Sequence, residues 1–264
     1  MTERNHSSVG RPNEGLEYTH FGAERVQIGA KAERVGQVFR AVAPRYDMMN
    51  DLMSGGLHRL WKDALVAWLA PGLSARDYWH ADLAGGTGDI AYRVQDAAGG
   101  RAQSIVIDIN PAMLARGRLR PEAQRLRGQL TFVAGDAERI PLPDRSIDAV
   151  TIAFGIRNVT RIECALEEAF RVLRLGGRFL CLEFSHVSVP VLDDLYDAYS
   201  DRVIPVLGQT VAGQGDAYRY LIESIRRFPH QDEFAQMMEA GGFERVSYRD
   251  LTGGIAAMHS GWRL

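Results

Sequence analysis

The sequence predicts an α/β fold in which a mostly parallel sheet carries helices on both faces and ends in an antiparallel hairpin. Apolar, β-rich runs alternate with helical patterns from about residue 78 to residue 184, as is typical of a parallel sheet covered on both sides. Two strand-like pieces, Arg245 to Leu251 and Ile255 to His259, then flank the turn Thr252-Gly253-Gly254. At 264 residues, one large domain with short additions is favoured over two independent domains.

The chain ahead of the sheet divides into two parts. Residues 1–30 are polar and contain glycine without sustained periodicity, which predicts a flexible N-terminal arm. Apolar residues at helical spacing follow until Pro44, and a second helical run ends at Pro71-Gly72. We therefore expect residues 31–264 to form a single domain that begins with a helical cap over 31–71.

The alternating region predicts five strands and the helices between them. The expected strands are Tyr78 to Leu83, Ser104 to Asp108, Leu130 to Ala134, Ile147 to Ala153 and Phe179 to Phe184. Helices are expected from Asp89, after Pro111, and from Ile162 to Leu173. The pattern then changes to a helical insertion over about 190–220, and a helix from Gln231 to Ala240 precedes the closing hairpin.

The loop Gly85-Gly86-Thr87-Gly88 joins the first strand to its helix. Three glycines in four residues let the backbone turn sharply and approach a ligand closely, because no Cβ stands in the way. A strand, a glycine turn and a helix N-terminus together form a cradle for a nucleotide. The loop alone also fits a dinucleotide fingerprint, since Ala91 follows at the right spacing, so a nicotinamide dehydrogenase is an alternative.

Two acidic residues follow the next two strands. Asp108 ends the second strand, where a carboxylate can accept hydrogen bonds from both ribose hydroxyls of a nucleotide. Asp136 follows the third, where it can accept from an adenine amino group while the backbone amide of Ala137 meets a ring nitrogen. Each acid alone also fits a helix cap or a loop carboxylate. Together with Gly86 they fall at the carboxyl ends of the strands, and Thr87 either caps the helix or meets the ligand's amino-acid end.

Charge and cysteine content narrow the class of protein. The formal net charge of −2 gives no global signature of nucleic-acid binding. A local run from Arg116 to Arg127 fits either a solvated helix face or attraction to an anionic membrane. Cys164 and Cys181 match no metal or redox spacing, so no metal site is expected. No apolar stretch reaches the roughly 18 residues of a membrane span, and the N-terminus fits no targeting peptide, which predicts a cytoplasmic protein.

The glycine loop, Asp108, Asp136 and the closing hairpin together resemble the class I S-adenosyl-L-methionine (SAM)-dependent methyltransferases. The resemblance covers about Tyr78 to the C-terminus and implies a Rossmann-like, seven-stranded sheet whose last strand is antiparallel. It implies SAM as the cofactor. A nicotinamide dehydrogenase would explain neither Asp136 nor the hairpin.

Further stretches narrow the resemblance. They are Tyr46 to Ser54 with His58 to Lys62, Phe154 to Val159, Glu183 to Ser185, Tyr196 to Ser200 and Tyr218 to Leu221. Together they resemble the UbiE-type family of quinone-biosynthesis C-methyltransferases, from Thr19 to Leu264. The resemblance makes 31–264 a methyltransferase domain whose cap over 31–71 covers the substrate.

The resemblance implies methylation of a ring carbon in a prenylated benzoquinol of ubiquinone biosynthesis, a demethylmenaquinol of menaquinone biosynthesis, or both. It places the cofactor contacts on Thr87, Asp108, Asp136 and Ala137. The chain departs from many members in three places, with Asp136 for Asn, Ala153 for a contacting Ser and Ala217 for Ser. Two alternatives stay open: a methyltransferase of another small phenol, and a non-catalytic SAM-binding scaffold of a quinone-synthesis complex.

The chemistry of carbon methylation indicates what the substrate site must do. The ring must be electron-rich, so the substrate is a hydroquinone, and a free phenol has a pKa of about 10. The site must therefore stabilise the phenolate, accept its proton, or both. Arg157 is the candidate for phenolate stabilisation, Asn158 for orienting the same oxygen, and His58 for accepting the proton, while Tyr46 and Asn50 are candidates for the substrate wall.

Each of these residues also has a purely structural interpretation. The Tyr and Met side chains around Tyr46 fit core packing, and His58 fits a histidine whose hydrogen bonds are made within the protein. The long isoprenoid tail of such a substrate needs an apolar groove or access to the bilayer. Peripheral membrane contact through the N-terminal helices or the insertion is therefore a hypothesis. Other quinone-biosynthesis enzymes and a second copy of the chain are further candidate partners.

Overall fold

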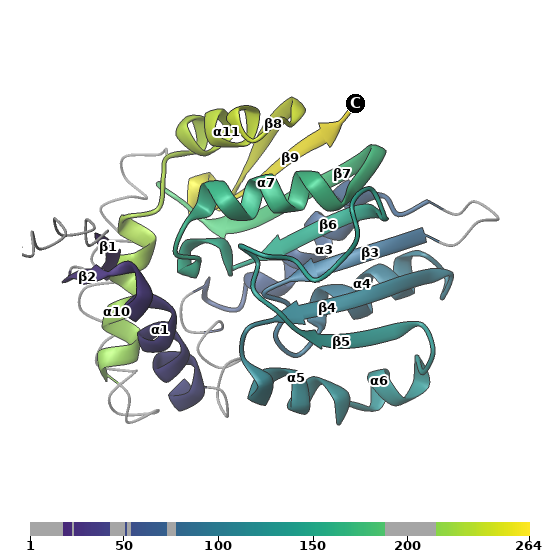
Figure 1. Ribbon diagram of the computed structural model, residues 1–264, viewed down its shortest axis with the longest axis horizontal. Helices are drawn as coiled ribbons and strands as arrows, with labels where there is room; N and C mark the ends of the chain where they lie inside the picture. The colour runs from purple at the N-terminus through teal and green to yellow at the C-terminus, as the bar shows by residue number, and fades with distance from the viewer. Residues whose placement is uncertain (1–17, 23, 43–50, 52–53, 73–77, 188–214) are drawn as a thin grey trace, which may run out of the picture.

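A seven-stranded sheet forms the centre of the computed structural model (Figure 1). The structure describes residues 18–22, 24–42, 51, 54–72, 78–187 and 215–264. The strands of this sheet are β3 (Tyr78–Leu83), β4 (Ala102–Asp108), β5 (Leu130–Ala134), β6 (Ile147–Ala153), β7 (Leu173–Phe184), β8 (Glu244–Leu251) and β9 (Ala256–Arg263). They lie in the order β5-β4-β3-β6-β7-β9-β8.

The pairing directions confirm the predicted fold. β3 to β7 pair with one another in parallel, whereas β9 runs antiparallel to both β7 and β8. β3, β5 and β6 begin and end where the sequence predicts. β7 begins at Leu173 rather than at Phe179, because Leu173 pairs with Ile147 of β6 ahead of the turn at Gly176, which interrupts the apolar run.

The two faces of the sheet carry different helices, as Figure 1 shows. The helices are α3 (His58–Leu69), α4 (Asp89–Ala97), α5 (Pro111–Arg118), α6 (Pro121–Arg125), α7 (Ile162–Val172) and α11 (Gln231–Ala240). Leu180 and Leu182 of β7 belong to one core with α3 and α4. Phe179 and Cys181 of the same strand belong to a second core with α7 and α11. This alternation explains why the strand reads as a continuous apolar run.

Part of the predicted flexible arm over 1–30 has regular structure, in the described residues 18–22 and 24–30. Strands β1 (Tyr18–Phe21) and β2 (Glu24–Gln27) pair antiparallel and lead into α1 (Ile28–Val42). The ring of Phe21 stacks on that of Tyr220 in α10 (Gly215–Arg226), with centroids 4.3 Å apart. Strands of four residues are too short to show a period, and this hairpin depends on packing against a helix far away in sequence.

These N-terminal elements and α10 lie together at one end of the sheet, beside the carboxyl ends of its parallel strands (Figure 1). The turn glycine Gly22 has φ +57° and abuts the side chain of Glu223. Most of the insertion expected over 190–220 lies outside the described residues. Within the part of the chain that is described, no helix is long and apolar enough to cross a membrane.

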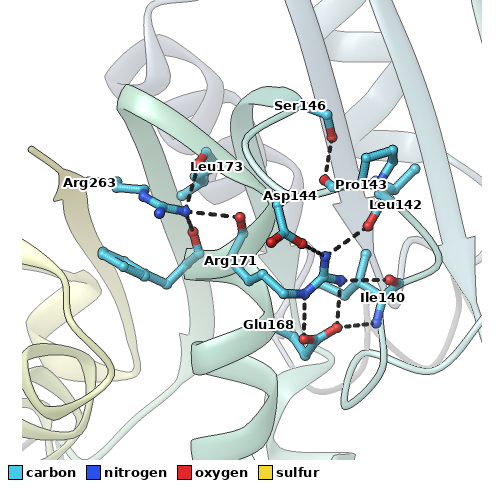
Figure 2. A network of polar contacts seen from close by, with 10 residues as sticks. Ile140, Leu142, Pro143, Asp144, Ser146, Glu168, Arg171, Leu173 and Arg263 are labelled. Atoms are coloured by element: carbon cyan, nitrogen blue, oxygen red, sulfur yellow. Dashed lines mark hydrogen bonds and ion pairs between the residues drawn. The ribbon is translucent and has the colours of Figure 1, made fainter.

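The loop between β5 and β6 is held against α7 by one arginine (Figure 2). Arg171 bonds both oxygens of Glu168, at 2.6 and 2.8 Å, and one oxygen of Asp144 at 2.6 Å. It also donates to the carbonyls of Ile140 and Leu142, at 2.9 and 3.0 Å. One guanidinium is thus the shared hydrogen-bond donor of two carbonyl groups and two carboxylates. Removing it would leave all of these acceptors without that donor at once.

We expect Arg171→Met to lower the free energy of unfolding by about 1–3 kcal/mol, because several part-buried acceptors lose their donor at once. Denaturant unfolding would measure it. The matched control is Arg125→Met, which removes an ion pair with Asp96 whose two side chains are 65% and 70% exposed. That change should cost no more than about 0.5 kcal/mol. Equal effects of the two substitutions would contradict the role given to Arg171.

Candidate active site

A pocket of about 840 Å³, its open mouth included, lies at the carboxyl ends of the parallel strands. It is bordered by the loops that follow β3, β4, β5 and β6, and by α1 on the outer side. The sequence-predicted residues that line it are Gly86, Asp108, Asp136, Ala137 and Asn158. These residues are far apart in sequence, and the parallel topology brings them to one edge of the sheet.

The glycine loop after β3 forms the floor of this pocket. Gly86 has φ +56°, a conformation that other residues rarely adopt, and a Cβ there would lie 3.2 Å from the methyl carbon of Met113. Gly88 is the N-cap of α4 and no side chain caps that helix, so the capping alternative for Thr87 is not realised. Thr87 is not among the described residues that line the pocket.

Asp108 joins the glycine loop to the next loop along the sheet. Its Oδ2 accepts from the amide of Gly86 at 2.8 Å, and its Oδ1 accepts from the amide of Asn110 at 2.7 Å. Burial raises the pKa of this carboxyl, and the two amides oppose that rise. Each oxygen has a second lone pair, so the carboxylate can still accept from a ligand's hydroxyls.

Two further polar groups border the pocket. Asn110 uses its Oδ1 to cap α5, accepting from Ala112 at 3.0 Å, and its buried Nδ2 has no hydrogen-bond partner in the described structure. Asp136 is exposed at the pocket and accepts from the amide of Glu138 through one oxygen, at 2.9 Å. Ala137 lines the pocket beside it. An unpaired donor, two carboxylates and a glycine floor fit a ligand that carries hydroxyl and amino groups.

The loop after β6 begins with a turn of 3-10 helix, η2 (Ile156–Asn158), and contains Arg157. The guanidinium of Arg157 is buried and forms an ion pair with Glu183 of β7, and it also donates to the carbonyl of Phe154 at 3.0 Å. Its Nε has no partner among the described residues. Burial raises the pKa of Glu183, and the cation of Arg157 opposes that rise. Arg157 lines a second pocket, next to the first.

Asn158 and its neighbours connect this loop to the N-terminal region and to α10. The Tyr220 hydroxyl donates to Oδ1 of Asn158 at 3.0 Å, and Nζ of Lys31 donates to the carbonyl of Val159 at 2.8 Å. Oε1 of Glu138 accepts from the amide of Thr160 at 3.0 Å. Sequence reasoning assigned no role to these partners, although Glu183 and Tyr220 stood in stretches that carried the resemblance.

His58 is the residue predicted to accept the phenolic proton. It begins α3, is buried, and its Nε2 lies 2.9 Å from Oδ1 of Asp51. Burial lowers its pKa, as does the charge of Lys62, while Asp51 opposes the shift. Neither pocket is lined by His58 in the part of the chain that the structure describes. Its Nδ1 has no hydrogen-bond partner among the described residues, and its service as proton acceptor stays a prediction.

Three further predicted positions are Tyr46, Asn50 and Ala153. Tyr46 and Asn50 lie outside the described residues. Ala153, where many members carry a contacting serine, ends β6 and pairs with Leu182 of β7. It is not one of the described residues that line the pocket.

The fold and the pocket together define a class I SAM-dependent methyltransferase. The seven-stranded sheet, its antiparallel last strand, the glycine floor and the acids at the ends of β4 and β5 are the features of that class that the sequence analysis predicted. The adenosyl and amino-acid parts of SAM carry the hydroxyl and amino groups that the pocket's acceptors suit.

The comparisons with known proteins name the family. The model of the ubiE/COQ5 methyltransferase family matches residues 27–263, and the chain belongs to this family. Two similar proteins carry the name ubiquinone/menaquinone biosynthesis C-methyltransferase UbiE. The one from Methylobacterium nodulans is 60% identical over 246 residues, covering 93% of this chain and 97% of its own. The one from Brucella abortus is 57% identical over 251 residues, covering 95% and 92%.

Solved structures with lower identity support the fold alone. A SAM-dependent methyltransferase from Thermotoga maritima has a TM-score of 0.60 at 20% identity, covering 87% of this chain and 100% of its own. A phosphoethanolamine-type N-methyltransferase from Haemonchus contortus, solved with S-adenosylhomocysteine, has a TM-score of 0.57 at 13% identity, covering 77% and 52%.

We expect Asp108→Asn to weaken SAM binding about 10-fold or more, because both of its oxygens accept from backbone amides and an amide nitrogen cannot replace either one. Asp136→Asn is the matched control. It keeps an oxygen for the single amide and for an adenine amino group, so the Kd should change by no more than about 3-fold. Calorimetric titration with SAM measures both. Equal losses would contradict the distinction drawn between the two acids.

Proposed function

We propose that this chain transfers a methyl group from SAM to a ring carbon of a prenylated quinol, which is a demethylmenaquinol, a 2-polyprenyl-6-methoxy-1,4-benzoquinol, or both. The observation that carries the proposal is the family match over residues 27–263, joined to two relatives of 57–60% identity that carry a C-methyltransferase name. The arrangement of the described residues supports it, since the pocket lined by Gly86, Asp108 and Asp136 adjoins a second pocket that contains buried cationic side chains.

The residues at the cofactor pocket bind SAM and orient it. The carboxylate of Asp108 suits the ribose hydroxyls, while Asp136 and the amide of Ala137 suit the adenine edge. Gly86 lets the backbone approach the cofactor closely. Once bound, SAM supplies the methyl group as an electrophile on its sulfonium sulfur. Positioning of that methyl against the ring carbon supplies much of the rate enhancement.

The residues after β6 have the task of raising the ring's reactivity. A hydroquinone becomes a stronger carbon nucleophile when a phenolic oxygen is ionised. Arg157 favours the ionised oxygen through its positive charge, and Asn158 orients it, because its carboxamide stands at the cofactor pocket and is fixed by Tyr220. Glu183 keeps Arg157 in place.

The assay that tests the function uses methyl-labelled SAM and short-tailed demethylmenaquinol or benzoquinol under reducing conditions. We expect a product labelled on a ring carbon. Arg157→Met should lower kcat about 100-fold or more, as removal of a group that stabilises developing charge does. Cofactor binding without product on either ring would contradict the proposed function.

A second variant separates catalysis from stability. Arg157→Met leaves the carboxylate of Glu183 buried without its cation, which costs about 3–5 kcal/mol. The double variant Arg157→Met with Glu183→Gln removes both charges and should recover much of the folding stability. If Arg157 acts on the substrate, kcat stays low in the double variant. Recovery of kcat along with stability would limit Arg157 to a structural role.

The isoprenoid tail of the proposed substrate is a reason to propose that the protein contacts the bilayer peripherally. Leu119, at the end of α5, is 76% exposed and stands between Arg118 and Arg120 in the chain. An apolar side chain among cations suits an anionic membrane surface. Contacts with other quinone-biosynthesis enzymes and between copies of the chain stay predictions.

Co-sedimentation with vesicles that contain an anionic phospholipid tests this contact. We expect binding at low salt that weakens as salt is raised, because screening shortens the reach of surface charges to about 10 Å at 0.1 M. Vesicles of zwitterionic phospholipid alone are the control. An absence of bound protein at low salt would contradict the proposal.

A further inference from the structure

The second pocket, of about 920 Å³ with its open mouth included, lies between the N-terminal hairpin, the loop after β6 and α10. It shares Val159 and Thr160 with the cofactor pocket, so the two are neighbours separated by this loop. Lys31, Arg157 and Tyr220 line it. These three residues are buried, so the wall of the pocket carries two cationic side chains and one phenol hydroxyl.

Lys31 is a buried lysine in the wall of the second pocket. Its side chain comes from α1 and the residue is only 8% exposed, although lysine is rarely buried without a carboxylate partner. Nζ donates to the carbonyl of Val159 at 2.8 Å, and no ion pair of Lys31 is found in the part of the chain that is described. An ammonium has three protons, so two stay available for a ligand.

The charges around the pocket make Lys31 important for an anionic ligand. The charge of Arg157 is balanced by Glu183, with which it forms a buried pair. Lys31 brings a positive charge that is not paired in this way. A cation close to a phenolic oxygen favours its ionised form.

We propose that Lys31 is a substrate-binding residue of the second pocket, where its ammonium donates to a phenolic oxygen of the quinol and stabilises the phenolate. The O–H bond breaks with its electron pair left on oxygen, and the proton passes to water at the open side of the pocket. This inference rests on the proposed function and assigns the quinol ring to the second pocket, with the reacting carbon facing the shared wall at Val159 and Thr160.

The pH dependence has a definite sign. Lys31 must be charged, so its contribution is present below its pKa and is lost as pH rises through it. Burial lowers that pKa, and the carboxylate of Glu138 partly opposes the shift, which brings the loss to lower pH than for an exposed lysine. The other titratable groups that line the pocket are His20, Arg157, Glu163, Tyr220 and Arg227. Burial raises the pKa of Tyr220 to about 12.

The experiment compares Lys31→Met and Lys31→Arg with the unchanged protein, measuring kcat from about pH 7 to about pH 10. We expect Lys31→Met to lower kcat about 100-fold and to abolish the fall at alkaline pH. Lys31→Arg should keep kcat within about 10-fold and should also lack that fall, because guanidinium stays charged. SAM affinity should stay within about 3-fold in both variants, since Lys31 does not line the cofactor pocket.

Arg34→Met is the matched control, because Arg34 lies on the same helix but pairs with Glu24 and is 45% exposed. Its kcat and pH profile should stay unchanged. A Lys31→Met profile that keeps the shape and height of the original would overturn the proposal. So would equal losses in the Met and Arg variants together with lost SAM affinity, which would show that Lys31 only docks α1 on Val159.

A binding measurement keeps this inference separate from the proposed function. 4-Nitrophenol absorbs differently as phenol and as phenolate, so its ionisation can be followed when it is bound without any methyl transfer. We expect the original protein to lower the pKa of the bound probe by about one unit more than Lys31→Met does. Equal pKa values would overturn the role of Lys31 even if quinol is methylated. A clear difference without methylated quinol would instead refute the proposed function alone.

Discussion

The buried ion pair between Arg157 and Glu183 is the interaction on which the site depends most. Removing two charges from water costs several kcal/mol each, so the pair is tolerated only where hydrogen bonds surround it. The amide of Phe184 donates to Glu183 at 2.9 Å, and Arg157 donates to the carbonyl of Phe154 at 3.0 Å. The backbone at the ends of β6 and β7 is thereby set in one geometry.

That geometry decides how distant parts of the chain meet. The loop after β6 presents the carboxamide of Asn158 to Tyr220 and the carbonyl of Val159 to Lys31. These two hydrogen bonds join α10 and α1 to the loop at the carboxyl end of β6. The stacking of Phe21 on Tyr220 attaches the N-terminal hairpin to α10. The first pocket is bordered mainly by loops that follow neighbouring strands, whereas the second combines the loop after β6 with the N-terminal region and α10.

Most of the sheet and the cofactor side could be predicted from the sequence because they depend on local rules. Strand bounds follow from apolar runs, and the loop at Gly86 follows from residues that allow a positive φ. Asp108 and Asp136 could be placed together because the ends of parallel strands share one edge. The hairpin at residues 18–27 was missed, since its strands carry no period and depend on contacts with α10.

The sequence by itself determined the fold class, the family resemblance and the position of the cofactor pocket, because each is encoded in short spacings along the chain. Only the tertiary structure decided the partners of the catalytic candidates. It paired Arg157 with Glu183, placed His58 beside Asp51 and brought Lys31 to a pocket that it shares with Arg157. The physical reason is that burial and charge pairing depend on which elements pack together, and the two partners can be 7 residues apart, as for His58 and Asp51, or 128 apart, as for Lys31 and Val159. No local pattern records such contacts.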